Sequence, residues 1–159
     1  MSNNTVKLAV YGNPAVEIEG KLLAAVGTDV VRPGLLMERV DSGSGTIAYR
    51  PHSTAEGKAA KLIVVENIYF GKGIDDYYKS AATPLDDKVY MIYARPGDVV
   101  WCLLPASQVI TIGMYLYSNG SGYVMQSVGT PTEGSIIGSS LENISTGVGV
   151  VKHIKVEIV

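Results

Sequence analysis

The sequence has few charged residues and a single cysteine. Charged residues make up 18% of the 159-residue chain, below the roughly one quarter that is typical of soluble domains. The formal net charge is −2, so no excess of Lys and Arg is present to bind nucleic acid. Because Cys102 is the single cysteine, a disulfide framework within these residues is excluded. Low charge of this kind favours a protein whose exterior largely contacts other proteins.

Long apolar runs are also lacking. No stretch approaches the roughly 18 apolar residues that indicate a membrane-spanning helix. The first residues, MSNNTVKLAV, lack the basic region and the apolar segment of a signal peptide. We therefore expect a soluble protein that does not associate with a membrane and carries no visible export signal.

Motifs for catalysis or cofactor binding are absent too. The Gly-Ser segments at 41–45 and 118–122 lack the lysine of a phosphate-binding loop, and they lack the third glycine and following helix of a dinucleotide site. His52, expected in an exposed loop, and His153, at the start of the last strand, have no second ligand at metal-binding spacing. The apolar sequence around Cys102 indicates a buried thiol. We therefore predict no catalytic residue, no cofactor, no metal site and no enzyme activity.

Glycine and strand-forming residues dominate what is present. Hydrophobic residues make up 47% of the chain, and eighteen glycines and seven prolines divide it into short segments. Alternating, β-branched and aromatic patterns predict strands. The predicted strands are residues 46–50, 61–69, 88–94, 98–104, 114–118, 122–128 and 153–159. This pattern predicts a mainly β protein, either a compact β-barrel or a β-sandwich.

Finer features follow from the turns between these strands. The short Pro96-Gly97 connection predicts antiparallel pairing of residues 88–94 with residues 98–104. The two Gly-Ser segments are predicted to be hairpin tips. Residues 73–82 and 139–147 are the candidates for one or two short helices.

The two ends of the chain differ in pattern. Residues 1–20 begin polar and then alternate weakly, which predicts an extended N-terminal arm followed by a single β-rich domain over residues 21–159. Small polar residues around 129–147 predict a long exposed loop.

Tyrosine is unusually frequent, with ten tyrosines against one phenylalanine. Tyrosine combines an apolar ring with a polar tip and is enriched at protein interfaces. The tyrosines therefore fit either the rim of an ordinary β-sheet or a large contact surface, and both interpretations remain open. If the second holds, the candidate interface aromatics are Tyr77, Tyr78, Tyr115 and Tyr117.

Residues 61–125 carry several motifs in a recognisable order. These are Glu66-Asn67 after an apolar strand, the Gly-Lys-Gly-Ile-Asp-Asp segment at 71–76, the Pro-Gly-Asp turn at 96–98 and the segment from Gly113 through Gly122. Together they resemble the head decoration, or cement, proteins of tailed bacteriophages.

The resemblance implies a structural protein made in the host cytoplasm that binds the exterior of an expanded capsid. Such proteins bridge neighbouring major capsid proteins, are often homotrimers, and place an N-terminal arm on the capsid. Here the arm would bind through Val6, Leu8, Val10 and Tyr11, since residues 6, 8 and 10 alternate well enough to add a strand to a partner sheet.

An alternative function is also compatible with the composition. A β-sandwich that binds carbohydrate or another ligand would use Trp101, His52 or exposed tyrosines as stacking platforms. Such a module on a virion or cell surface does not exclude a role in a phage head.

Overall fold

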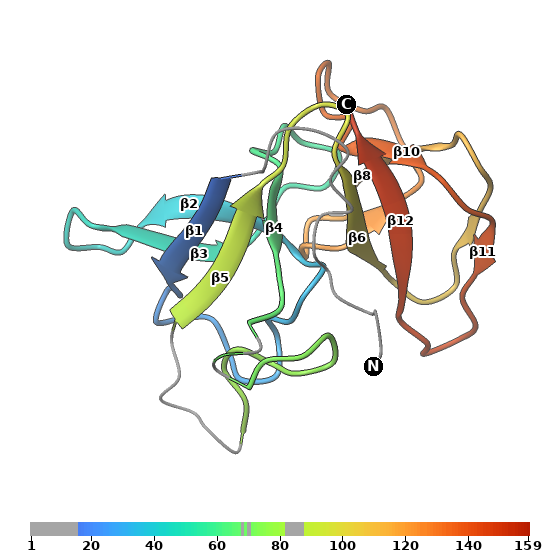
Figure 1. The fold of residues 1–159 in the computed structure, drawn as a ribbon. Helices are drawn as coiled ribbons and strands as arrows, with labels where there is room; N and C mark the ends of the chain where they lie inside the picture. The colour runs from blue at the N-terminus through green and yellow to red at the C-terminus, as the bar shows by residue number, and fades with distance from the viewer. Residues whose placement is uncertain (1–15, 68, 70, 82–87) are drawn as a thin grey trace.

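Two curled antiparallel sheets, each built from one half of the chain, make up most of the computed structural model (Figure 1). The structure describes residues 16–67, 69, 71–81 and 88–159. The first sheet has the order β1-β5-β4-β2-β3, with β1 (Val16–Lys21), β2 (Leu36–Asp41), β3 (Ile47–Pro51), β4 (Leu62–Val64) and β5 (Lys88–Tyr93). These strands confirm the prediction of a mainly β fold.

The second sheet has the order β6-β12-β10-β8-β9. Its strands are β6 (Val99–Leu104), β8 (Tyr115–Ser118), β9 (Val124–Met125), β10 (Gly138–Ser140) and β12 (Lys152–Ile158). A small separate sheet pairs β7 (Val109–Ile110) with β11 (Ile144–Ser145). The alternation of the last strand is observed, because Ile154, Val156 and Ile158 are buried.

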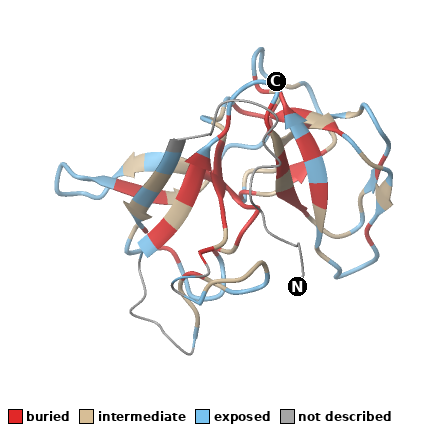
Figure 2. Cartoon of the chain, viewed as in Figure 1, coloured by how far each residue is buried: buried red, intermediate tan, exposed pale blue. Residues whose placement is uncertain are grey.

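The central strands of the first sheet are buried on both faces. All three residues of β4 are buried (Figure 2). Ile63 faces the core between the two sheets, while Leu62 and Val64 face a second core inside the curl of the first sheet. This explains why residues 62–65 are uniformly apolar, since a strand covered on both faces has no polar side.

The first sheet closes partly on itself into a half-barrel. Leu22, at the end of β1, forms a parallel bridge with Tyr49 of β3, and the Leu23 N–H donates to the Tyr49 carbonyl at 2.8 Å. A Cβ on Gly20 would lie 2.4 Å from the Tyr49 ring. Glycine at position 20 is therefore required for the ring to lie across β1.

The two sheets are joined through the backbone at Gly34 and Gly122. The Gly34 N–H donates to Val64 of β4, and its carbonyl accepts from Leu103 of β6, both at 2.8 Å. The Gly122 carbonyl accepts from Leu36 at 2.7 Å. Both glycines have positive φ, 92° and 82°, and neighbouring atoms lie close to the position a Cβ would take. The junction thus tolerates no side chain at either position.

Both Gly-Ser segments are hairpin tips, as predicted. The Ser42 N–H donates to Thr46 between β2 and β3, and the Asn119 N–H donates to Tyr123 between β8 and β9. The first tip extends away from the body of the molecule (Figure 1). The second packs inward, where Gly120 meets the backbone of Ala55.

The predicted pairing across Pro96-Gly97 is wrong. A turn forms there, with the Asp98 N–H donating to Arg95 at 3.0 Å, but β5 and β6 belong to different sheets. The Gly97 N–H donates to Ile158 at 2.8 Å, and β6 then pairs with β12 along its length. The turn therefore carries the chain from one sheet to the other.

Neither predicted helix is present in the described residues. Within 73–81, the Asp76 carboxylate accepts the Gly73 N–H in a tight turn, and the Tyr78 N–H donates to Val31. Within 139–147, residues 138–140 and 144–145 are strands. In both segments, backbone groups that a helix would use internally are bonded to distant segments instead.

The loop predicted to be exposed at 129–147 is also partly buried. Ser135 and Ile137 have no exposed surface. The Glu56 carboxylate accepts the N–H groups of Val128 and Gly129 at 2.7 and 3.2 Å. These hydrogen bonds, that from Val128 first, hold the pKa of Glu56 below its usual value. A charged anchor therefore fixes the start of this loop.

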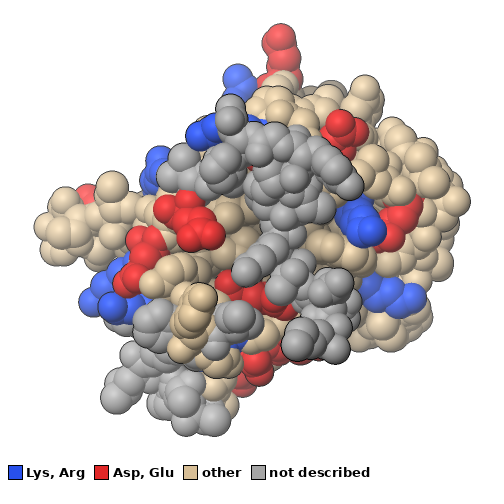
Figure 3. Space-filling view, viewed as in Figure 1, with Lys and Arg blue, Asp and Glu red and all other residues tan. Residues whose placement is uncertain are grey.

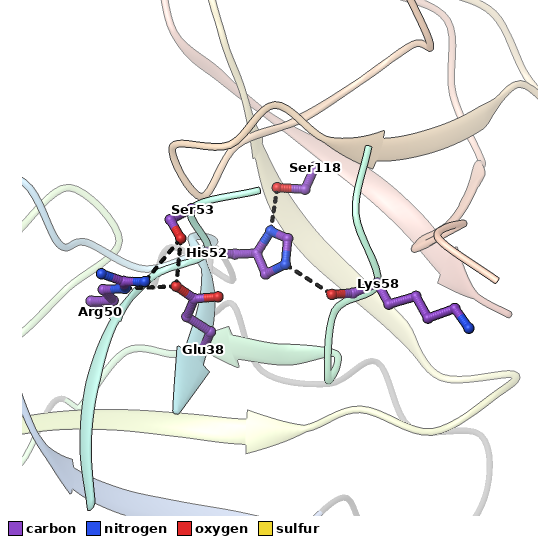
Figure 4. Close-up of polar contacts among 6 residues, drawn as sticks. All are labelled: Glu38, Arg50, His52, Ser53, Lys58 and Ser118. Atoms are coloured by element: carbon purple, nitrogen blue, oxygen red, sulfur yellow. Dashed lines mark hydrogen bonds and ion pairs between the residues drawn. The ribbon is translucent and has the colours of Figure 1, made fainter. Parts of the chain in front are cut away.

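His52 is buried, which contradicts the predicted exposed loop. Its Nε2 donates to the Lys58 carbonyl at 3.0 Å, because a carbonyl oxygen only accepts (Figure 4). In the neutral imidazole, Nδ1 then accepts from the Ser118 hydroxyl at 2.7 Å. His52 therefore holds the end of β3 against β8 of the other sheet.

We expect Gly122→Ala to destabilise the fold more than Gly113→Ala. Both positions have φ of 82°, but only at residue 122 does a Cβ meet other atoms, with Leu35 at 2.8 Å. The shared backbone strain costs about 1–2 kcal/mol, and overpacking at residue 122 adds about 1–3 kcal/mol. Urea denaturation measures both free energies of unfolding; equal losses would contradict this account of the junction.

Replacing Ser118 with alanine should cost about 1–3 kcal/mol, because it leaves Nδ1 of His52 buried without a donor. Ser53→Ala is the control, since Ser53 is exposed and also loses a hydroxyl hydrogen bond, to Glu38 at 2.7 Å. Water can replace that bond, so the loss should stay within about 0.5 kcal/mol. Thermal and urea denaturation compare the two variants, and a similar loss in both would argue against a supporting role for His52.

Candidate contact surface

The four predicted interface tyrosines are not gathered in one place. Tyr115 and Tyr117 share one face of β8, with Tyr115 54% exposed and Tyr117 half-buried. Tyr77 is half-buried in the 71–81 segment, where the Arg32 guanidinium lies 5.9 Å from its ring centre. The predicted arm residues Val6, Leu8, Val10 and Tyr11 lie outside the described residues, and residues 16–20 of the predicted arm belong to β1.

Tyr78 is buried, with 2% of its surface exposed. Its hydroxyl donates to the Val65 carbonyl, and its ring packs in the core inside the first sheet. Tyr78 therefore holds the 71–81 segment onto the fold and is not included in the contact surface described below.

One part of the molecule has almost no charge. Residues 105–150 contain no Lys or Arg and only two acidic residues, Glu133 and Glu142. One of these carboxylates is engaged within the fold, because Glu142 accepts the Lys155 N–H at 2.9 Å. The right-hand edge of the molecule, where β11 lies, is free of charged side chains in Figure 3, with charged side chains beside it. One neighbouring charge comes from β12, since the Lys152 ammonium donates to the Ser145 carbonyl of β11 at 2.9 Å.

Exposed apolar side chains concentrate in the same part of the chain. We call the exposed apolar side chains of residues 109–115 and 141–150 the neutral surface, which leaves out Val128; they are Val109, Ile112, Tyr115, Leu141, Val148 and Val150. Ile112 is 63% exposed and Val148 is 93% exposed. Clustered apolar side chains on a surface depleted of charge are typical of protein contact sites.

Backbone hydrogen bonds bring the two segments of the neutral surface together. Val109 pairs with Ser145 in the small β7–β11 sheet. The Gly113 N–H donates to Ser140 at 2.8 Å, and the Asn143 side chain accepts the Ile112 N–H at 2.9 Å. Residues 109–115 and 141–150 therefore lie side by side on a framework that is already ordered.

Sequence motifs did not reveal the neutral surface, although a signal was present. The scarcity of charged residues at 105–150, the charge gap, can be read from the sequence. The composition averaged over the whole chain does not show it. The apolar residues come from short strands and turns with no regular period, so alternation alone does not separate Val109 and Ile112 from core residues.

Cys102 and the His52–Ser118 pair, three groups with the chemistry of a nucleophile or its base, are buried in the core. Burial raises the pKa of the Cys102 thiol to about 12, so the thiol stays protonated and unreactive. The Ser118 hydroxyl bonds to His52 as a nucleophile would to its base, but the two residues are 0% and 2% exposed. Substrate therefore has no access to this pair.

Neither a metal site nor a membrane-spanning helix is found among the described residues. No group of three or more His, Cys, Asp or Glu side chains in them is placed to hold a metal ion. No helix in the described ranges is long and apolar enough to cross a membrane.

A polar cluster supports the base of the extended hairpin. Glu38 of β2 accepts from Arg50 of β3 at 2.6 Å and from Ser53 at 2.7 Å (Figure 4). Burial acts to raise the pKa of Glu38, but the hydrogen bonds from Ser53 and Arg50 outweigh it and lower that pKa. Arg50 also donates to Ser53 at 3.1 Å, so all three side chains bond to one another and join β2 to the end of β3.

Known proteins resemble this chain in fold. No protein-family model and no curated protein matches the sequence. Among solved structures, the fold is similar to the N base of the head fiber gp8.5 of bacteriophage phi29, with a TM-score of 0.53 and 11% identity. The similarity covers 91% of this chain and 93% of the other. The protein thus shares its fold with a protein of a phage head, the class that the sequence resemblance indicated.

Proposed function

We propose that the protein is a structural component of a phage virion that binds the outer surface of the expanded head. The observation that carries this proposal is the fold shared with a phage head fiber base over nearly the full length of both chains. The motif resemblance at residues 61–125 points independently to head decoration proteins. In this proposal the protein is not an enzyme, and its partner is the major capsid protein.

The neutral surface is the proposed site of capsid attachment. A surface with few charges loses little ion hydration when it is covered by another protein, and its exposed apolar side chains gain from the loss of water. By bridging two neighbouring capsid proteins, each attached copy would stabilise the shell against internal pressure. Assembly as a homotrimer would raise the strength of attachment, because linked copies bind a repeating lattice together.

The arm is the second proposed contact. Val6, Leu8 and Val10 alternate along the sequence, and Tyr11 follows them. An alternating segment of this kind is suited to adding a strand to the edge of a capsid sheet.

Ile112→Lys should weaken binding to expanded capsids by about tenfold or more, because it places a charge within the neutral surface. Ile47→Lys is a closely matched control, since Ile47 is 64% exposed and Ile112 is 63% exposed, but Ile47 lies on the extended hairpin. Co-sedimentation with expanded capsids measures both. Equal binding by the two variants would exclude the neutral surface, and absence of binding by the unmodified protein would overturn the proposed function.

Deletion of residues 1–12 should weaken capsid binding and leave the unfolding temperature of the isolated protein nearly unchanged. The deletion ends before β1, so the described hydrogen bonds remain in place. Co-sedimentation and thermal denaturation of the same preparation separate the two effects. Full binding by the truncated protein would show that the arm is not a contact.

A further inference from the structure

A small cleft lies between β6, β12 and the 71–81 segment, apart from the neutral surface. It is lined by Ile74, Asp75, Trp101 and His153 and has a volume of about 190 Å³. Trp101 and His153 come from the paired strands β6 and β12, and Ile74 and Asp75 come from the 71–81 segment. Three elements distant in sequence therefore converge on this cleft.

The walls of the cleft are held in place by the fold. The Pro33 carbonyl accepts from Nε2 of His153 at 3.0 Å, and the imidazole packs against Gly34, where a Cβ would lie 3.0 Å from the ring. The turn that carries Asp75 is closed by the hydrogen bond from Gly73 to Asp76 at 2.8 Å. The cleft is thus pre-organised.

The polar groups of the cleft retain free hydrogen-bonding capacity. Since Nε2 of His153 donates to a carbonyl, Nδ1 of the neutral imidazole is an acceptor. Burial is the main cause that lowers the pKa of His153, against the opposing effects of Pro33 and Asp75. Nδ1 of His153, the Asp75 carboxylate and the Trp101 indole N–H have no hydrogen-bond partner among the described residues.

These groups restrict the chemistry of a ligand. The Lys155 ammonium lies 5.1 Å from the centre of the Trp101 ring, so the attraction of that ring for a cation is already satisfied within the chain. An anionic ligand would meet Asp75 in the wall. A neutral molecule with an apolar face and several hydroxyl groups fits best, because it offers donors to Asp75 and His153 and C–H groups to Trp101 and Ile74.

We propose that this cleft binds one pyranose ring of a neutral carbohydrate. At about 190 Å³ the cleft is small, which limits the site to a single ring. For a ligand of this size, a Kd of about 1 mM is the expected order of magnitude. Glycan binding is a function distinct from capsid attachment and uses different residues.

Trp101 is the only tryptophan in the sequence, so intrinsic tryptophan fluorescence reports directly on the cleft. The full-length protein is titrated with the methyl glycosides of glucose, galactose, mannose and N-acetylglucosamine up to roughly 100 mM. A saturable change with at least one glycoside is expected. Glycerol, which has hydroxyl groups but no ring, is the negative probe. No saturable change with any glycoside, or an equal change with glycerol, would overturn the proposal.

Asp75→Ala should weaken the response at least tenfold, because the carboxylate accepts from the sugar hydroxyls and makes no hydrogen bond within the described fold. Glu17→Ala is the control, since it removes an exposed carboxylate of β1 in the other sheet, and it should respond like the unmodified protein. An unchanged response in Asp75→Ala would remove the site from this cleft. A saturable response to N-acetyl-lysine methylamide in place of the glycosides would overturn the carbohydrate assignment and indicate a cationic peptide. Capsid binding by Asp75→Ala should be retained, so that the failure of either proposal is recognised separately.

Discussion

The hydrogen bonds of Gly34 are the constraint on which the rest of the structure depends. The Gly34 N–H donates to β4 of the first sheet, and the Gly34 carbonyl accepts from β6 of the second sheet. These two hydrogen bonds join the sheets. A glycine is needed there because φ is positive and His153 lies against the position of a Cβ. The same contact orients His153 toward the cleft. The junction therefore sets the packing of the two sheets and also one wall of the proposed ligand site.

The fold class could be predicted from the sequence because the patterns that indicate it involve only neighbouring residues. Alternation in the last strand and the Gly-Ser hairpin tips depend on a few neighbouring residues, and both were observed. The pairing of β5 with β1 and β4 depends on residues far apart in sequence. The short turn at Pro96-Gly97 therefore gave a wrong prediction, that β5 pairs with β6. The helix predictions failed for the same reason, since residues 29 and 31 take the backbone hydrogen bonds of residues 78 and 79.

The candidate sites were harder to predict than the fold. Tyrosine frequency identified Tyr115, which is exposed, but it gave equal weight to Tyr78, which is buried. Burial depends on tertiary packing, which no tyrosine count contains. His52 looked exposed in a polar stretch, yet its ring bridges β3 and β8. Trp101 and His153 are 52 positions apart and become neighbours only through the register of β6 with β12.

The charge gap at residues 105–150 has a consequence for how the proposed attachment would respond to salt. Contacts between charged surfaces weaken as salt screens them. A contact made by Ile112, Val148 and their neighbours is instead governed by the release of water from apolar surface. Its strength should vary little with ionic strength, should rise in strongly hydrated salts such as sulfate, and should be accompanied by a negative heat-capacity change. A protein held to a virion in this way would stay attached when the virion moves between dilute and saline surroundings.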